Sequence, residues 1–198
     1  MPRRSLNPAC PRCLARGEPC LCAEIKPVHA RLEIVIVRHA AELRKQTGSA
    51  RWAALALGCS VIDYAATATP FDGSALPVED AWLLFPGAEA TPPPATPPRR
   101  LLVPDGTWQQ ARRMVGRVPE LRRLPRLSLG PALPSPRLRR PREAEGRSTL
   151  EAIADARALC GELGASAQLH ELNAAVLRRQ VRLRGTSGRG QAPGLLQR

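Results

Sequence analysis

The sequence predicts an α/β fold with a parallel sheet, preceded by a small N-terminal unit built on four cysteines. Short apolar segments rich in Val, Ile and Leu alternate with longer amphipathic segments, and strands that alternate with helices are typical of parallel sheets. The chain has 198 residues, of which 43% are hydrophobic, which is enough for one such domain and a small attachment. We expect the cysteine unit at 1–28, the main domain at 29–184 and a Gly-rich disordered tail at 185–198.

The individual elements follow from local patterns. The segment RLEIVIV (31–37) is apolar, β-branched and too short for a helix, so we expect a strand. In the next helix Ser49 is the expected N-cap and Gly58 the expected stop. Ser148 and Glu151 have the spacing of a capping box at the start of a later helix. The full set is strands at 31–37, 59–65, 81–87, 99–106 and 126–130, and helices at 49–58, 107–115, 148–163 and 166–184.

Two Pro-rich segments are expected to be loops. The segment TPPPATPP (91–98) is polyproline-like, and residues 131–147 form a basic loop interrupted by prolines. The helix after this second loop has apolar residues at helical spacing, which are expected to face the core. They are Leu150, Ile153, Leu159 and Leu163.

Three of the expected strands end in Pro or Gly, in the segments LLFPG, LLVPDG and LSLGP. Ligands of open α/β sheets collect at the edge where the carboxyl ends of the strands lie. Strand ends that contain Pro or Gly allow a flat ligand to approach the backbone closely. Each strand end taken singly is also explained by ordinary turn formation, in which Pro and Gly are common.

The segment Asp105-Gly106-Thr107-Trp108 joins the fourth expected strand to the next helix. The Asp105 carboxylate could cap that helix, a role that Thr107 could also fill, or it could be a general base facing a bound ligand. Trp108 could be a plain core residue. The residue types alone leave these interpretations open.

The chain is strongly basic. It has 30 Lys and Arg against 17 Asp and Glu, a formal net charge of +13 at pH 7, which favours a polyanionic partner such as nucleic acid over a merely basic surface. The aromatic fraction of 3% argues against stacking platforms of the RRM type. No apolar run reaches membrane-spanning length, and the N-terminus lacks the apolar segment of a secretory signal, so we expect a cytoplasmic protein without a membrane partner.

Four of the six cysteines form two close pairs, C-x2-C and C-x-C, separated by six residues: Cys10, Cys13, Cys20 and Cys22. This spacing can place four thiolates around one tetrahedral ion, and a reducing cytosol disfavours disulfides. We therefore expect a structural Zn2+, with no coordination position left open for catalysis. Cys59 and Cys160 stand alone in apolar contexts and are expected to be small core residues.

Taken in order, these motifs resemble those of the DTW-domain family, the tRNA-uridine aminocarboxypropyltransferases. The Asp-x-Thr-Trp signature is present at 105–108, followed by Ala111 and Met114, and the cysteine knuckle also matches. Further matches are His39, Glu42, the segments LLFPG and LSL, Arg137, Arg139, Ser148, Thr149, Leu150 and Glu151. The resemblance covers roughly residues 10–165, and the ordered set of short motifs is specific.

The sequence departs from the family pattern in three places. Ala40 stands where the family usually has Pro, Gly48-Ser49 replaces Asn-Thr, and residues 91–98 form an extended loop. The Gly48-Ser49 change falls near the expected substrate pocket, so it bears on the choice of substrate.

The resemblance implies a SPOUT-like, knotted domain, a rare exception among folds. It also implies transfer of the 3-amino-3-carboxypropyl group of S-adenosylmethionine to N3 of a uridine in tRNA, with release of methylthioadenosine. Asp105 is then the candidate base for the N3 proton. The residues expected to bind S-adenosylmethionine are Phe85, Pro86, Gly87, Val103, Trp108, Leu129, Ser148, Thr149 and Leu150. The residues expected to contact tRNA are Arg112, Arg137, Arg139, Arg140 and Arg142, of which some could instead hold the carboxylate of the transferred group.

Two other functions fit the same motifs. One is an S-adenosylmethionine-dependent modification of another RNA such as rRNA, or a methyl transfer. The other is a non-catalytic, zinc-stabilised RNA-binding protein. In each case we expect a monomer.

Overall fold

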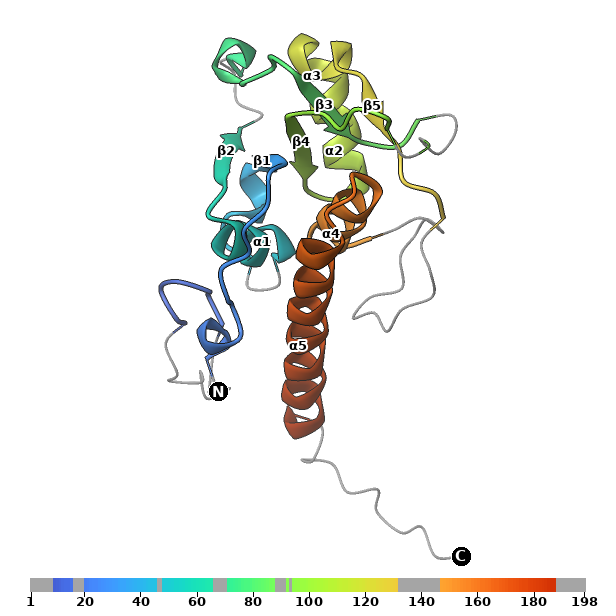
Figure 1. Cartoon of the computed structure of the whole chain (residues 1–198). Helices are drawn as coiled ribbons and strands as arrows, with labels where there is room; N and C mark the ends of the chain where they lie inside the picture. The colour runs from blue at the N-terminus through green and yellow to red at the C-terminus, as the bar shows by residue number, and fades with distance from the viewer. Residues whose placement is uncertain are drawn as a thin grey trace, which may run out of the picture.

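The computed structural model is an α/β fold in which helices pack on both faces of a parallel sheet (Figure 1). It describes residues 9–15, 20–45, 48–65, 71–87, 92, 94–131 and 147–187, with side chains described as far as Arg179. The strands are β1 (Glu33–His39), β2 (Ser60–Tyr64), β3 (Ala81–Leu84), β4 (Arg100–Asp105) and β5 (Arg126–Leu127). The α-helices are α1 (Ser49–Leu57), α2 (Trp108–Arg117), α3 (Pro119–Arg123), α4 (Thr149–Leu159) and α5 (Leu163–Ser187). Short 3-10 turns are η1 (Leu21–Ala23), η2 (Ala40–Glu42) and η3 (Gly73–Ala75).

The sheet confirms the expected class. Its five strands are ordered β2-β1-β4-β3-β5, and every pairing between them is parallel. β4 lies between β1 and β3 and pairs with both. Because paired parallel strands run in the same direction, the carboxyl ends of β1 and β4 lie side by side at one edge.

The apolar run in β1 is explained by burial on both faces of the sheet. Successive side chains of a strand point to opposite faces. Ile34 and Ile36 pack into the cluster that contains residues of α1, α4 and α5, whereas Val35 and Val37 pack into the cluster that contains residues of α2 and α3. A strand buried in this way is apolar without alternation, which is the pattern of RLEIVIV.

Two expectations about helix ends are wrong. Gly48, not Ser49, is the N-cap of α1, so the Ser49 hydroxyl is available for another hydrogen bond. α4 ends at Leu159, and Gly161 has a φ of 83°, a left-handed conformation that favours glycine and stops a helix. Leu163 therefore begins α5 and is 69% exposed rather than buried.

Other boundaries also differ. α3 was not expected; a proline begins it, which suits a first helical position. β5 is shorter than the expected strand at 126–130. α5 continues to Ser187, three residues into the expected tail, because an established helix propagates across Gly185 at a cost of about 1 kcal/mol.

Several expected loops lie partly or wholly outside the described residues. Residues 132–146 and 188–198 are outside them, and the described part of 91–98 forms neither helix nor strand. Within the ranges that the structure describes, no helix is long and apolar enough to span a membrane.

Candidate functional site

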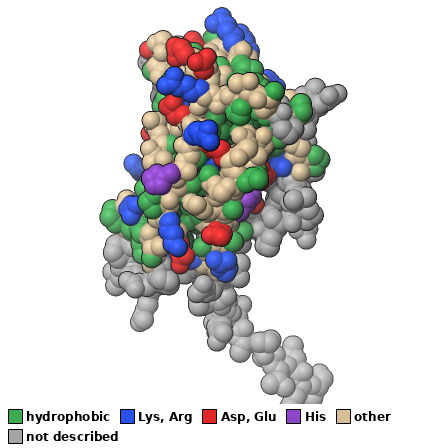
Figure 2. Space-filling model, in the orientation of Figure 1, with side chains coloured by type: hydrophobic (Ala, Val, Ile, Leu, Met, Phe, Trp, Pro, Cys, Tyr) green, Lys and Arg blue, Asp and Glu red, His purple; other side chains and the backbone are tan. Residues whose placement is uncertain are grey.

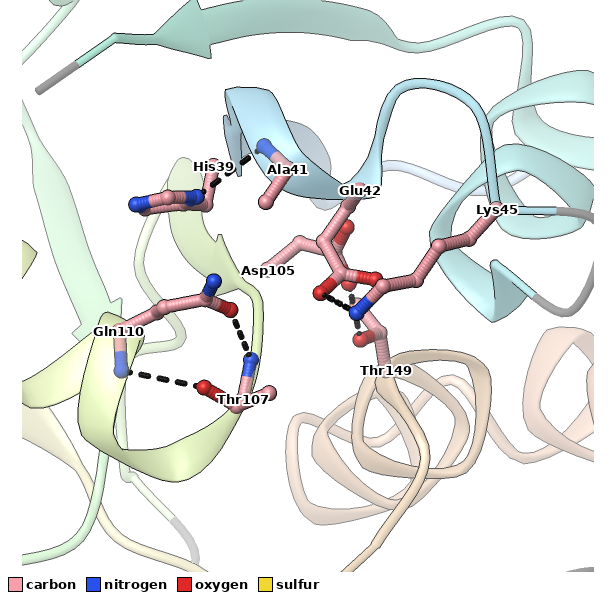
Figure 3. A network of polar contacts seen from close by, with 8 residues as sticks. All are labelled: His39, Ala41, Glu42, Lys45, Asp105, Thr107, Gln110 and Thr149. Atoms are coloured by element: carbon pink, nitrogen blue, oxygen red, sulfur yellow. Dashed lines mark hydrogen bonds and ion pairs between the residues drawn. The ribbon is translucent and has the colours of Figure 1, made fainter.

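Polar side chains from three distant segments meet at the carboxyl edge of the sheet (Figure 3). Asp105 is the last residue of β4, Glu42 ends the η2 turn that follows β1, and Thr149 is the first residue of α4. Ser49 at the start of α1 and Lys45 complete the set. We call these five residues the Asp105 cluster.

Thr107, not Asp105, caps the helix after β4. The Thr107 hydroxyl accepts a hydrogen bond from the backbone N–H of Gln110 at 3.3 Å, and the Gln110 Oε1 accepts one from the backbone N–H of Thr107 at 2.7 Å. This reciprocal pair is a capping box, which satisfies the first free donors of α2. The Asp105 carboxylate therefore has no capping role and is free for other contacts (Figure 3).

Asp105 is buried and bound by a hydroxyl group. Asp105 is only 6% exposed. Its Oδ1 accepts a hydrogen bond from the Thr149 Oγ1 at 2.6 Å. The backbone N–H of Thr149 in turn donates to the Ser49 Oγ at 3.0 Å. The departure from the family at Ser49 therefore lies one hydrogen bond away from the residue that holds Asp105.

The groups around Asp105 have opposite effects on the pKa of its carboxyl group. Burial raises the pKa of Asp105 above its ordinary value; the hydrogen bond from Thr149 lowers it, the negative charge of Glu42 raises it, and the positive charges of Arg38 and Lys45 lower it. Burial is the largest of these effects, so the pKa is raised. A carboxyl group with a raised pKa at the edge of a parallel sheet is suited to exchange a proton with a bound ligand.

Lys45 forms an ion pair with Glu42, within the same short segment. The two side chains come from the segment that follows β1 and lie beside Asp105 at the end of β4 (Figure 3). The ion pair holds a second carboxylate close enough to Asp105 to affect its charge state.

Gly106 allows the strands and α2 to approach one another closely. A Cβ atom at this position would lie 3.1 Å from the Gln110 Cβ and 3.3 Å from the His39 Cβ, both tighter than ordinary contact. Glycine at the x position of the signature therefore has a steric reason in this chain: it lets the first turn of α2 pack against the end of β1.

Two aromatic rings stack beside the Asp105 cluster. The rings of Phe85 and Trp108 are 5.3 Å apart with an interplanar angle of 6°. The Arg112 guanidinium lies 6.0 Å from the Trp108 ring and that of Arg126 lies 5.5 Å from the Phe85 ring. Trp108 is 38% exposed, so it is not a core residue. The arrangement offers an aromatic and cationic edge to a ligand.

The structure gathers the expected S-adenosylmethionine-binding residues around the carboxyl ends of β3, β4 and β5 and the start of α4. The backbone N–H of Gly87 donates to the Ser128 Oγ at 2.9 Å, which ties the end of β3 to the end of β5. Val103 and Leu150 are fully buried in the core. Ser148 caps α4 through the expected capping box with Glu151.

The expected RNA-binding residues are described only in part. Arg112 is exposed on α2, whereas residues 137–142 lie outside the described ranges. Figure 2 shows Lys and Arg side chains spread over the described part of one face, with acidic side chains between them.

The four clustered cysteines fit a metal ion. Their Sγ atoms all lie within 4.8 Å of one another, with 3.7 Å between Cys10 and Cys22 and 3.6 Å between Cys13 and Cys20. A tetrahedral ion with Zn–S bonds of about 2.3 Å requires S···S separations of about 3.8 Å. Cys59 and Cys160 are not part of this group; they contact the hydrophobic core, as expected.

The four thiol groups lie in unequal surroundings. Hydrogen bonds from the backbone of Cys13 and Arg12 lower the pKa of Cys10 to about 6, whereas burial raises the pKa of Cys22 to about 12. A metal ion binds cysteines as thiolates, so its binding would release the protons that these thiols hold.

Sequence reasoning missed part of the site. The use of the Ser49 hydroxyl and the proximity of Lys45 and Arg38 to Asp105 were not expected. Arg126 beside Phe85 was not expected either. The family match at Glu42 was the one available signal, because Lys45 follows it at a spacing of three residues that favours an ion pair.

Comparison with known proteins agrees with this arrangement. The family model described as the DTW domain matches residues 7–181, a range that contains both the four cysteines and the Asp105 cluster. No solved structure matches the chain significantly. The chain therefore belongs to the DTW-domain family, which includes tRNA-uridine aminocarboxypropyltransferases.

Proposed function

We propose that this protein transfers the 3-amino-3-carboxypropyl group of S-adenosylmethionine to N3 of a uridine in tRNA. The observation that carries the proposal is the Asp105 carboxylate, buried at the end of β4, held by the Thr149 hydroxyl and raised in pKa. The family includes enzymes with this activity. The reaction requires one proton acceptor, and Asp105 is the candidate.

The proposed step balances with Asp105 as the base. Asp105 takes the N3 proton of uridine, N3 forms a bond to Cγ of the aminocarboxypropyl group, and the Cγ–S bond breaks with its electron pair on sulfur. S-adenosylmethionine supplies an electrophile that its sulfonium already activates. The sulfur-containing product is the neutral thioether methylthioadenosine.

A raised pKa suits this role. A general base is most effective when its pKa lies near the operating pH, and burial moves the pKa of Asp105 in that direction. Transfer of the aminocarboxypropyl group rather than the methyl group then depends on which carbon is held beside N3, which is a positioning effect.

The residues around the carboxyl edge fit a nucleoside with an amino-acid tail. Phe85 and Trp108 stack on each other and offer an aromatic edge to an adenine base, and the half-buried Pro86 and exposed Gly87 allow close approach. We propose the full expected set for S-adenosylmethionine: Phe85, Pro86, Gly87, Val103, Trp108, Leu129, Ser148, Thr149 and Leu150.

The chemistry also restricts the RNA. The N3–H of uridine is a donor on its Watson–Crick edge, so the target base must be unpaired, as in a loop whose bases can be splayed out. The net charge of +13 supports binding to the phosphate backbone, and we propose Arg112, Arg137, Arg139, Arg140 and Arg142 as contacts. A double substitution of Arg139 and Arg140 by Ala should weaken tRNA binding and reduce its salt dependence; unchanged binding and rate would remove this segment from the interface.

Three further features complete the proposal. The ion in the cysteine knuckle is Zn2+, in a structural role, because four thiolates close its coordination sphere. The chain follows the knotted SPOUT-like course, which the central position of β4 supports. The protein acts as a monomer in the cytoplasm. Reduced thiols persist in that compartment.

Nucleoside mass spectrometry tests the proposed reaction. Purified protein, tRNA and S-adenosylmethionine should yield a uridine that is heavier by one aminocarboxypropyl group, and tRNA from a deletion strain should lack it. A product heavier by one methyl group would support methyl transfer instead, and a product on rRNA alone would support another RNA substrate. Binding of tRNA without binding of S-adenosylmethionine, measured by calorimetry, would support a non-catalytic RNA-binding protein.

A further inference from the structure

Helix α1 contacts the cysteine knuckle through Trp52. The Trp52 indole is buried, and its Nε1–H donates a hydrogen bond to the backbone carbonyl of Cys13 at 3.3 Å. Cys13 is itself fully buried, and its Sγ belongs to the group that fits a metal ion. The position of α1 is therefore linked to the backbone of a metal ligand.

The same helix contacts the Asp105 cluster through its first residue. Ser49 accepts the hydrogen bond from the Thr149 N–H at 3.0 Å, and Thr149 donates its hydroxyl to Asp105 at 2.6 Å. Ser49 and Trp52 are three residues apart in one helix, which separates them by about 4.5 Å along the axis. A shift of α1 at one of these contacts therefore moves the other.

We propose that Ser49 and Trp52 are positioning residues, which hold the Thr149–Asp105 hydrogen bond in place relative to the metal-binding knuckle. The link runs from Cys13 through Trp52 and Ser49 of α1 to Thr149. The part that concerns catalysis rests on the proposed role of Asp105 as the base. The knuckle then has a function beyond local stability: it sets the position of one donor in the catalytic site.

Two local explanations account for less of the geometry. A buried indole N–H requires a hydrogen-bond partner, but this requirement does not explain why the partner is a ligand of the knuckle. Ser49 would be an ordinary N-cap if its hydroxyl bound its own helix, but Gly48 occupies that position and the Ser49 hydroxyl binds α4 instead.

The link predicts a measurable effect on Asp105. The groups that face the carboxylate are Thr149 from α4, Glu42 and Lys45 from the segment after β1, and Arg38 from β1. Of these, Thr149 is the group whose backbone bonds to the Ser49 side chain of α1; the segment of Glu42 and Lys45 meets the same helix elsewhere, through Arg51 and the Leu43 carbonyl. Loss of either α1 contact should weaken the hydrogen bond from Thr149, and the pKa of Asp105 should rise because that hydrogen bond stabilises the carboxylate.

The experiment is an NMR titration of the Asp105 carboxyl carbon in zinc-loaded protein, with the signal assigned through the Asp105→Asn variant. Thr149→Val should raise the pKa by about one unit. Ser49→Ala and Trp52→Phe should raise it by smaller amounts, Ser49→Thr should restore it, and zinc content should stay at one equivalent. Trp82→Phe is the matched control, because Trp82 lies in β3 and packs on the same core; it should have no effect.

Unchanged titration in Ser49→Ala and Trp52→Phe, beside a shift in Thr149→Val, would overturn the link. A shift in Trp82→Phe equal to that in Trp52→Phe would overturn it too, because the effect would then be general loosening of the core. If Trp52→Phe does not fold, Ser49→Ala at its half-buried position decides alone. The titration involves no group transfer, so an inactive protein with the expected shifts contradicts only the proposed function.

Discussion

The hydroxyl of Thr149 donates a hydrogen bond of 2.6 Å to the Oδ1 of Asp105, although the two residues are 44 positions apart. The contact joins the first residue of α4 to the last residue of β4. It places the only donor described for this buried carboxylate on a segment that also belongs to the family resemblance.

Thr149→Val should impair transfer mainly at low pH. Valine keeps the shape of threonine but removes the hydroxyl, so the carboxylate loses the hydrogen bond that lowers its pKa. The acidic limb of the single-turnover pH–rate profile should move to higher pH by about one unit, while the rate on the plateau changes little. The profile is measured at saturating S-adenosylmethionine, because Thr149 also belongs to the set proposed to bind it. A uniform loss at every pH under this condition would show that Thr149 does not act through the pKa of Asp105.

Asp105→Asn should fold normally and lose about 10²–10⁴ in transfer rate. Asparagine keeps the size of the side chain and can accept the Thr149 hydrogen bond, but it cannot take the proton. The matched measurements are single-turnover transfer and a titration with S-adenosylmethionine. Near wild-type transfer by the folded variant would make the signature structural, and a large loss of S-adenosylmethionine affinity would move Asp105 to the binding of the cofactor's amino group.

The same variant should also change how stability depends on pH. The folded-state pKa of Asp105 is raised above its ordinary value by burial, so at pH values between the two the folded protein holds a proton that the unfolded chain has released. This contribution to stability is fully present below the ordinary pKa and is lost as pH rises through the raised one. The free energy of unfolding, measured with urea, should therefore be higher for Asp105→Asn relative to wild type at neutral pH than in acid.

Glu42 and Lys45 should shift the pH–rate profile in opposite directions. Glu42 raises the pKa of Asp105 and Lys45 lowers it, so Glu42→Gln should move the acidic limb to lower pH and Lys45→Met should move it to higher pH. The two variants serve as controls for each other, because each breaks the same ion pair. Shifts in the same direction would show that the ion pair, rather than either charge, controls Asp105.

Gly106→Ala should reduce both stability and activity. The added Cβ would press on the Cβ atoms of Gln110 and His39 at 3.1 and 3.3 Å, and overpacking of this kind costs about 1–3 kcal/mol. Gly116→Ala within α2 is the control, because no atom lies within 4 Å of its added Cβ; it should stabilise by about 0.5–1 kcal/mol. Equal unfolding free energies for the two variants would contradict the steric reason.

Removal of the metal should destabilise the protein. Elemental analysis should find about one zinc per chain, and a strong chelator or Cys10→Ser should lower the melting temperature. Cys59→Ser is the control, because Cys59 lies outside the group that fits a metal; it should keep its zinc. Retention of metal and stability in both Cys10→Ser and Cys20→Ser would refute the assignment.

Local patterns were sufficient for much of the fold. The apolar run of β1, the capping box of Ser148 and Glu151 and the end of α1 at Gly58 were predicted correctly, because each depends on contacts within a few residues or on burial that the residue types report directly. The grouping of the four cysteines was predictable for the same reason, since all four lie in one short segment.

Tertiary structure alone decided the surroundings of Asp105. Thr107 could cap α2 equally well from the sequence, and the choice between them depends on α4, which delivers Thr149 to the carboxylate. The bond between Ser49 and Thr149 spans 100 positions, a distance over which helical or strand periodicity carries no information. Such contacts depend on the order of the strands, which places the end of β4 between its neighbours and so determines which segments meet there.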